Sequence, residues 1–371
     1  MAKSGRGLPH SKSWRRTKDS WTSRSVLDCG CPLPLSREAT VKKLRTRVLE
    51  LRRTINIITS RHYNPTHPSN LFQPALACIL SAVRTFFKLV TTLLLAAVFL
   101  FVVYAYWLWR NQERMIFLPH SRADLTEILQ QSHGLIESLS YEHEGKKQTA
   151  FFIPSRDGMQ SGRIWIGFHG NGSIALDWLN LLPRQLPTDD GFLLVDYPGY
   201  GLCEGKPTVA LLLPQAELAV EALAKKIAVD RKALDQRLDV MGYSLGTGVA
   251  MEFAARHPVR RVILFAPYTS LADMAKRTVG PVLAKALRAD LDNRARLQEI
   301  ASRPAQDRPR IIIFHGEKDD DIPFSMGEAL AREFPEFCQW RPYANANHID
   351  IGQAAAEEFQ RSLRNPPAPW E

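Results

Sequence analysis

Hydrophobic positions along this chain fall into two contrasting patterns. Residues 89–109 form one apolar run, LVTTLLLAAVFLFVVYAYWLW, of 21 residues without a charge. Beyond it, short runs rich in Ile, Val, Phe and Leu alternate with stretches of helical spacing. Continuous apolar runs are typical of strands covered on both faces, so we predict a single α/β domain with a doubly covered, mostly parallel sheet. The predicted strands are 149–153, 164–168, 192–196, 238–241, 262–265 and 310–314, and the main predicted helix between them is 209–227.

The uncharged run has the length of a membrane-spanning helix. At a rise of about 1.5 Å per residue, 21 residues cross the ~30 Å hydrocarbon core of a bilayer. Tyr104, Tyr106, Trp107 and Trp109 gather at its C-terminal end, like the aromatic belt of a membrane interface. Eighty-eight residues precede it, too many for an ordinary cleaved signal peptide. We therefore predict a hydrophobic anchor over 71–109 with its transmembrane core at 89–109.

Charge divides the chain at the same place. Residues 1–88 carry 17 Lys/Arg and 4 Asp/Glu, hence 17 − 4 = +13, whereas the other 283 residues carry 31 and 34, hence 31 − 34 = −3. The excess of basic residues therefore argues against nucleic-acid binding by the folded domain and favours contact with a membrane surface. By the positive-inside rule, the N-terminus is expected in the cytoplasm and the domain over 110–371 on the other side of the membrane.

Residues 1–70 have the composition of a basic, largely disordered extension. Within it, residues 41–58 place apolar side chains at spacings of three and four with Arg and Lys between them, which predicts a short basic amphipathic helix. Such a helix binds an anionic membrane face or is simply solvated. A transit peptide, or a true start further downstream, is an alternative explanation of the extension.

The stretch around Ser244 predicts a nucleophile. A short apolar strand ends at Gly242-Tyr243-Ser244-Leu245-Gly246, and residues 245–257 then have helical spacing up to Pro258. The sequence G-x-S-x-G between a strand and a helix forms a sharp turn that exposes the serine hydroxyl. The alternative is a structural turn with an ordinary capping serine.

Further chemistry follows the ends of other predicted strands, where the active sites of such sheets gather. His169-Gly170-Asn171-Gly172 follows the strand 164–168, and its small residues let backbone N–H groups point towards Ser244. Two such donors stabilise the anionic oxygen of a tetrahedral intermediate, and we expect these to be the amides of Asn171 and Leu245.

A carboxylate and a histidine would complete a catalytic triad. Asp319, Asp320 and Asp321 follow the strand 310–314, and chemistry alone does not choose among them; Asp319, three residues past Gly316, is preferred. His348 is the only histidine downstream of them, so the order Ser, acid, His selects it. His169 and His315 are interpreted as turn residues without ligand pairing, and neither a metal nor a cofactor is expected.

Taken together, these motifs resemble the α/β-hydrolase superfamily of serine hydrolases, in particular its membrane-anchored branch with one N-terminal transmembrane helix and a short cap. The resemblance covers residues 110–365 and implies Ser244 as nucleophile, Asp319 as acid, His348 as base, and an oxyanion hole at Asn171 and Leu245. One departure is Cys203, where the family commonly has serine. The matching segments are HGNG (169–172), DYPGYG with EGKP (196–201 and 204–207), GYSLG (242–246), APYTSLADMA (266–275), HGEKDDDIP (315–323) and NHID (347–350).

The predicted function is therefore hydrolysis of a carboxylic ester or thioester through an acyl-enzyme, by a protein held at the membrane by its helix and its basic extension. Residues 268–309 leave room only for a small cap with helices near 271–287, which favours a small-molecule acyl ester or lipid-like acyl substrate. Two alternatives remain: a serine peptidase of the same fold, and a non-catalytic membrane-tethered scaffold.

Overall fold

The computed structural model describes residues 49–50, 53, 72–121, 124–158, 162–186, 188–288 and 291–364. The chain divides into two compact units, one up to Val90 and one from Thr91 onward, and each is considered by itself. The predicted basic extension (1–70) and its amphipathic helix (41–58) lie outside the described residues, apart from residues 49, 50 and 53. Both therefore stay predictions.

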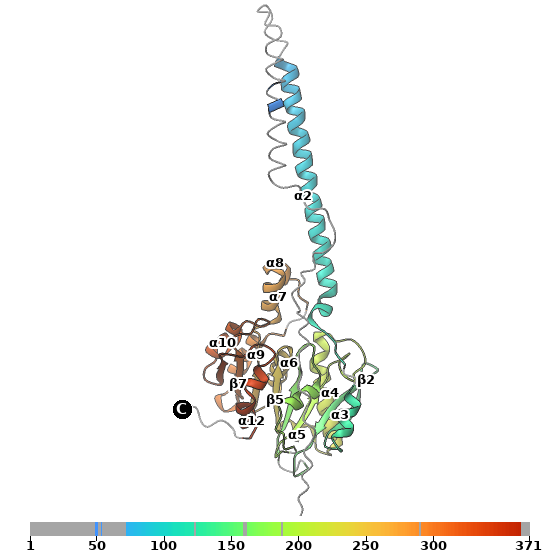
Figure 1. Cartoon of the computed structure of the whole chain (residues 1–371), viewed down its shortest axis with the longest axis vertical. Helices are drawn as coiled ribbons and strands as arrows, with labels where there is room; N and C mark the ends of the chain where they lie inside the picture. The colour runs from blue at the N-terminus through green and yellow to red at the C-terminus, as the bar shows by residue number, and fades with distance from the viewer. Residues whose placement is uncertain are drawn as a thin grey trace, which may run out of the picture. The chain divides into compact units, whose positions relative to one another are not determined.

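The first long element is helix α2 (Phe72–Ile116), drawn in blue to cyan in Figure 1. By length and composition, its segment Ala75–Ile116 could cross a membrane, and the most apolar window of that segment is not buried inside the protein. The helix does not end with the uncharged run at Trp109 but continues to Ile116. Its last turns therefore belong to the same compact unit as the sheet.

Eight strands form one sheet in the order β1-β2-β4-β3-β5-β6-β7-β8. The pairs β1–β2 and β2–β4 are antiparallel, and every other neighbouring pair is parallel. This arrangement confirms the predicted fold class. The strands are β1 (Glu137–His143), β2 (Lys146–Ile153), β3 (Ile164–Phe168), β4 (Gly191–Val195), β5 (Leu238–Tyr243), β6 (Arg261–Phe265), β7 (Arg310–Gly316) and β8 (Cys338–Tyr343).

The two edge strands, β1 and β8, were not predicted from the sequence. Their sequences, ESLSYEH and CQWRPY, hold few of the aliphatic residues that mark the central strands, and only one residue of each is fully buried. An edge strand pairs on one side only and exposes more of its side chains to water, so it lacks the continuous apolar run.

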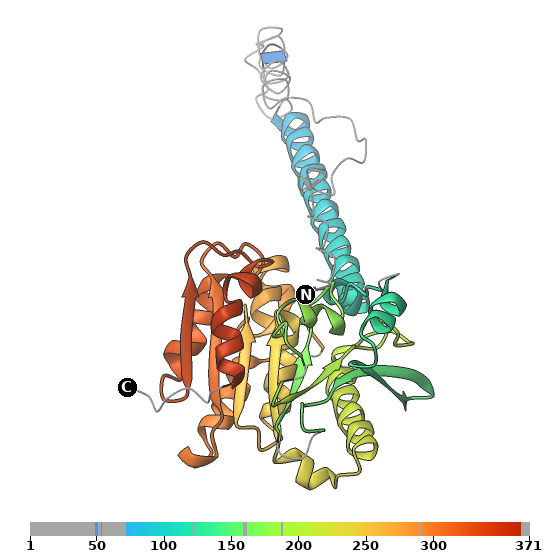
Figure 2. The same ribbon diagram turned by 60° about the horizontal axis from the view of Figure 1, so that its bottom comes forward.

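Helices cover both faces of the sheet (Figure 2). Along β3, Ile166 and Phe168 join one apolar core while Trp165 joins the other, because successive side chains of a strand point to opposite faces. The first core packs against α4 (Val209–Lys226), α6 (Leu245–Ala254), α9 (Asn293–Ala301) and α10 (Phe324–Glu333). The second packs against α3 (Leu125–Gln131), η1 (Ala175–Asn180), α11 (Ile351–Ala354) and α12 (Ala356–Arg364). Of the remaining helices, α5 (Arg231–Asp235) precedes β5, whereas α7 (Leu271–Val279), α8 (Pro281–Ala284) and η2 (Ala305–Asp307) lie between β6 and β7.

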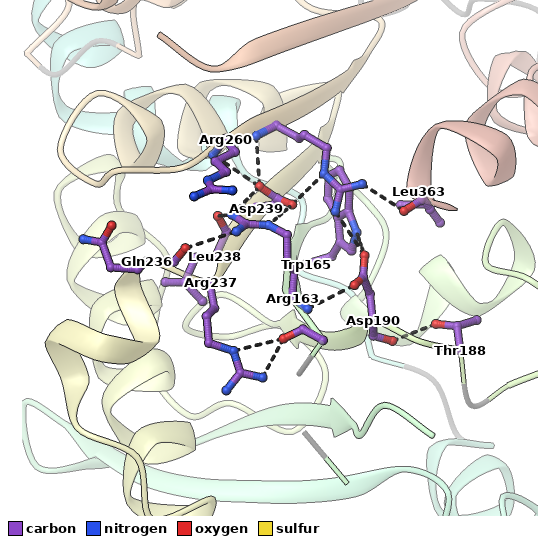
Figure 3. A network of polar contacts seen from close by, with 12 residues as sticks. Arg163, Trp165, Thr188, Asp190, Gln236, Arg237, Leu238, Asp239, Arg260 and Leu363 are labelled. Atoms are coloured by element: carbon purple, nitrogen blue, oxygen red, sulfur yellow. Dashed lines mark hydrogen bonds and ion pairs between the residues drawn. The ribbon is translucent and has the colours of Figure 1, made fainter. Parts of the chain in front are cut away.

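A buried ion-pair network ties the amino ends of the central strands together (Figure 3). Asp239, the second residue of β5, is fully buried, and its carboxylate accepts hydrogen bonds of 2.7 Å from the Nε atoms of both Arg163 and Arg261. The guanidinium of Arg261 also lies 3.0 Å from Asp190 and stacks over the ring of Trp165. A buried carboxylate is tolerated only with such partners, so the network holds β3, β4, β5 and β6 in register.

Candidate active site

Ser244 occupies the sharp turn between β5 and α6. Its backbone angles, φ 52° and ψ −118°, lie in a region that non-glycine residues rarely adopt, at a cost of about 1–3 kcal/mol. Its N–H donates to the carbonyl of Phe265, which holds the turn against β6. The strained turn directs the hydroxyl away from the sheet, as the G-x-S-x-G pattern predicts.

The glycines on either side of Ser244 permit this turn by their lack of a side chain. A Cβ on Gly242 would lie 2.5 Å from the carbonyl oxygen of Gly246, and a Cβ on Gly246 would collide with the carbonyl oxygen of Phe168. Both atoms are backbone and cannot move aside. The strand, the turn and the helix therefore meet at a distance that any larger residue would prevent.

The structure brings Ser244, His348 and Asp319 into one hydrogen-bonded line. His348 Nε2 lies 2.9 Å from Ser244 Oγ, and His348 Nδ1 lies 2.8 Å from Asp319 Oδ2. These residues follow three different strands, β5, β8 and β7, whose carboxyl ends share one edge of the sheet. The hydroxyl of Tyr243 donates to the carbonyl oxygen of His348 at 2.6 Å and so fixes the histidine loop above the serine.

Local hydrogen bonds distinguish Asp319 from its two neighbours. Its Oδ1 accepts from the N–H groups of Asp321 and Ile322, at 3.0 and 2.7 Å, whereas the side chains of Asp320 and Asp321 are exposed. Burial would raise the pKa of Asp319. The hydrogen bonds from His315, His348 and the amide of Ile322 outweigh burial and hold that pKa well below its usual range. Asp319 is therefore ionised at neutral pH and accepts a hydrogen bond from His348 Nδ1.

His315 touches the same carboxylate from the other side and was interpreted from the sequence only as a turn residue. This fully buried ring belongs to the penultimate residue of β7, and its Nε2 lies 3.3 Å from Asp319 Oδ2 and 3.1 Å from the carbonyl oxygen of Ile322. A Cβ on Gly327 would collide with its Nδ1, so α10 packs directly against the ring. The spacing of four residues between His315 and Asp319, straddling the end of a strand, was the signal available in the sequence.

Asn171 and Leu245 flank Ser244 in different ways. Leu245 is the first residue of α6, where backbone N–H groups have no acceptor within the helix. The side chain of Asn171 is held on the far side of its loop: Oδ1 accepts from the N–H of Leu118 and the hydroxyl of Tyr200, and Nδ2 donates to the carbonyl of Ile116. Its backbone N–H is the donor that we expect to face the serine. Its loop lies close, since a Cβ on Gly170 would touch Ser244 Cβ at 3.4 Å.

Two cavities meet at Ser244 and His348. The first, of about 450 Å³, is lined mainly by apolar side chains from the last turns of α2 and from α7 and α8. The second, of about 350 Å³, lies on the side of the 169–173 loop and includes polar side chains. Both volumes fall within or near the range of about 300–1,000 Å³ that small-molecule sites occupy.

His169 and Asp196 form a buried pair behind the 169–173 loop. His169 Nε2 lies 3.5 Å from Asp196 Oδ1, which also accepts from the N–H of Ala175. Burial lowers the pKa of His169 to about 4 and raises the pKa of Asp196 to about 7. At neutral pH His169 is therefore uncharged and Asp196 is only partly ionised, and the pair supports the 169–173 loop from behind. Within the described ranges, no three His, Cys, Asp or Glu side chains lie close enough together to hold a metal ion.

Cys203 is also buried away from the two cavities. Its Sγ lies 3.3 Å from both the N and the O of Thr149 on β2, and burial raises the pKa of its thiol to about 12. The thiol is thus protonated and bonded to the sheet. Cys203 therefore contributes to the packing beside β2 and lines neither cavity.

The comparisons with known proteins agree with this architecture. Residues 166–371, more than half of the chain, match the family described as "Alpha/beta hydrolase family". An uncharacterized protein of Mycobacterium tuberculosis is 27% identical over 257 residues, which cover 66% of this chain and 82% of the relative. Human alpha/beta hydrolase domain-containing protein 17B is 32% identical over 163 residues, 42% of this chain and 50% of the relative.

Solved structures show the same fold at lower identity. An alpha-beta hydrolase from Vibrio vulnificus superposes with a TM-score of 0.51 at 16% identity, over 66% of this chain and 86% of that one. The 2,6-dihydroxy-pseudo-oxynicotine hydrolase has a TM-score of 0.51 at 18% identity, over 66% and 74%. The chain therefore belongs to the alpha/beta hydrolase family.

Proposed function

We propose that this protein is a membrane-anchored serine hydrolase that cleaves carboxylic ester or thioester bonds, lipid-like acyl substrates among them. The observation that carries the proposal is the ring of His348, which lies within hydrogen-bond distance of Ser244 Oγ on one side and Asp319 Oδ2 on the other. A nucleophile, a base and an orienting carboxylate in this order are the parts that acyl transfer to water requires.

In the proposed mechanism, His348 Nε2 takes the proton of Ser244 as Oγ attacks the acyl carbonyl carbon. The carbonyl oxygen becomes an anion, which the backbone amides of Asn171 and Leu245 stabilise. The intermediate collapses as the bond to the leaving oxygen or sulfur breaks, and the leaving group takes the proton from His348. Water then attacks the acyl-enzyme with His348 again as base, which releases the acid and restores Ser244. Throughout, ionised Asp319 stabilises the imidazolium.

The direct test is labelling of the full-length protein in membranes with a fluorophosphonate probe. We expect covalent labelling of the wild-type protein and its loss in Ser244→Ala, together with loss of ester turnover. Labelling that persists in Ser244→Ala would place the reactive nucleophile elsewhere in the chain, whereas a wild-type protein that neither labels nor hydrolyses any ester would support the scaffold alternative. Faster cleavage of amide than of matched ester substrates would support the peptidase.

The membrane placement is part of the same proposal. Supporting it are the length and apolar composition of α2 and the basic excess of residues 1–88. We propose an N-terminal extension (1–70), an anchor (71–109) and a catalytic domain (110–371), with the N-terminus in the cytoplasm and the catalytic domain across the membrane. Protease added to the cytoplasmic face of sealed vesicles should leave residues 110–371 intact; digestion of that domain would reverse the orientation.

A further inference from the structure

The two cavities at Ser244 differ in their walls, and this difference bears on the substrate. The larger cavity is walled by Leu108, Trp109 and Met115 of α2 and by side chains of α7 and α8, such as Met274 and Leu283. The last turns of the long apolar helix are thus one wall of the site. A cavity of this composition favours a hydrocarbon group, because binding removes the apolar surface of both the group and the cavity wall from water.

Hydrogen bonds fix that wall in place. Gln112 of α2 is buried, and its Oε1 accepts from the N–H of Arg288 at the end of the cap. The guanidinium of Arg288 lies over the ring of Trp109, with 4.8 Å to the ring centroid. The helix end and the cap are therefore joined at the mouth of the larger cavity, which gives the cavity a defined volume.

That volume has room for one chain. At about 450 Å³ it lies in the lower part of the range of about 300–1,000 Å³ that small-molecule sites occupy. A cavity of that size favours one acyl chain over the two chains of a diacyl lipid.

The smaller cavity adds hydrogen-bonding groups to a wall that is otherwise apolar. Ser173, Asp177, Asn180 and Gln353 contribute polar side chains beside apolar ones such as Trp178. Among the described residues that line either cavity there is no lysine or arginine, whereas Asp177 lines the smaller cavity and Asp321 the larger one. Proteins usually bind anionic groups through arginine or lysine. A phosphate or carboxylate on the leaving group would therefore have no cationic partner among these lining residues.

We propose, building on the serine hydrolase function above, that the substrate is a single-chain acyl ester or thioester whose polar leaving group carries no negative charge. The acyl chain occupies the cavity between α2 and the cap, the carbonyl carbon lies at Ser244 Oγ, and the polar part occupies the cavity beside the 169–173 loop.

The charge selection is tested with two lipids that share one acyl chain. The full-length protein in neutral detergent micelles is given 1-monomyristoylglycerol or 1-myristoyl lysophosphatidic acid, and release of myristic acid is measured. We expect kcat/KM to be at least about tenfold higher for the neutral lipid. Gln353→Lys places a cation in the smaller cavity and should narrow that ratio several-fold. Its neighbour Ala354 is exposed and does not line the cavity, so Ala354→Lys should leave the ratio unchanged.

The acyl side is tested by filling the larger cavity. Ala275 of α7 lines it and is half-buried, so Ala275→Phe should shift the preferred chain to shorter p-nitrophenyl esters while turnover of the butyrate ester is retained. Val282 of α8 is 69% exposed and does not line the cavity, which makes Val282→Phe the matched control. Equal turnover of the two lipids, or a chain-length profile that Ala275→Phe does not change, would overturn the inference while Ser244-dependent turnover still stood. If the wild-type protein turned over none of these esters, the result would instead count against the proposed function.

Discussion

The two ends of strand β5 carry polar groups that are treated in opposite ways. At the amino end, Asp239 is fully buried and bonded to Arg163 and Arg261, so its charge is satisfied within the chain. Directly after the carboxyl end, Ser244 has a strained backbone and a hydroxyl that lines two cavities. The polar groups at the amino end thus hold the sheet together, whereas the hydroxyl at the carboxyl end faces cavities that a substrate can occupy.

A structural carboxylate and a proposed catalytic one can be distinguished by their hydrogen-bond partners. Asp239 and Asp319 are both buried carboxylates with several donors, but all described partners of Asp239 belong to arginines. Those of Asp319 include a histidine whose other nitrogen reaches the hydroxyl of Ser244, the proposed nucleophile. A matched pair of substitutions should therefore separate activity from stability.

The largest effect is expected from Asp319→Asn. The uncharged amide cannot stabilise the imidazolium of His348, and its NH₂ group favours the tautomer of that ring in which Nε2 carries the proton. Nε2 could then not take the proton of Ser244, so kcat should fall by about 10⁴-fold. Ester turnover is measured together with circular dichroism and the melting curve, which should still show a folded, cooperatively melting protein. Turnover within tenfold of the wild-type value would remove Asp319 from the proposed triad.

Asp239→Asn should have the opposite effect. Arg163 would lose its buried counter-charge and Arg261 would keep only Asp190, and breaking such a buried pair typically costs about 3–5 kcal/mol of unfolding free energy. Denaturant unfolding in detergent micelles measures that loss, while kcat of the folded protein, normalised by fluorophosphonate labelling, should stay near the wild-type value. A strong loss of kcat per labelled site would mean that the two ends of β5 are coupled.

Asp196→Asn sharpens the comparison, because Asp196 follows the carboxyl end of β4, at the same edge of the sheet as Ser244, but is buried and lines neither cavity. Its native pKa of about 7 exceeds the ordinary value of 3.8, so its contribution to stability falls as pH rises between these values. The native pKa of His169 is about 4, below the ordinary 6.5, so the contribution of His169 rises with pH over nearly the same range. In the wild-type protein the two contributions largely cancel.

With Asn at position 196 only the contribution of His169 remains. The unfolding free energy should then increase by up to about 1.4 kcal/mol per pH unit between pH about 4 and 6.5. Unfolding curves at pH 5 and pH 6.5 measure the slope for both proteins. The same slope in the variant as in the wild-type protein would show that the contributions of Asp196 and His169 do not cancel as described.

The smallest effect is expected at His315, which positions Asp319. In His315→Asn the shorter side chain cannot reach the carboxylate, and loss of one hydrogen bond to a charged group, about 1.5 kcal/mol, should lower kcat about tenfold with KM unchanged. In His315→Gln the amide nitrogen replaces Nε2, so part of kcat should return. Equal kcat in the two variants would assign the ring to packing alone.

Much of the fold could be predicted from the sequence, because its central strands are continuous apolar runs. The strand at 164–168 was predicted with the bounds that β3 has, and the helix at 209–227 differs from α4 by one residue. The edge strands β1 and β8 could not be predicted, since exposure on one side removes the apolar signal. The membrane anchor, the domain boundaries and the role of each site residue remain predictions.

What the sequence determined by itself was local. The glycines around Ser244 dictate a turn through their lack of a side chain, and chain order singles out His348. Tertiary structure decided what depends on distant segments meeting: which of three adjacent aspartates bonds to His348, that His315 supports the same carboxylate, and that the last turns of α2 wall a cavity at Ser244. The contacts of His348 and of α2 join residues far apart along the chain, and the short spacing of His315 and Asp319 does not show that their side chains meet until the fold orients both.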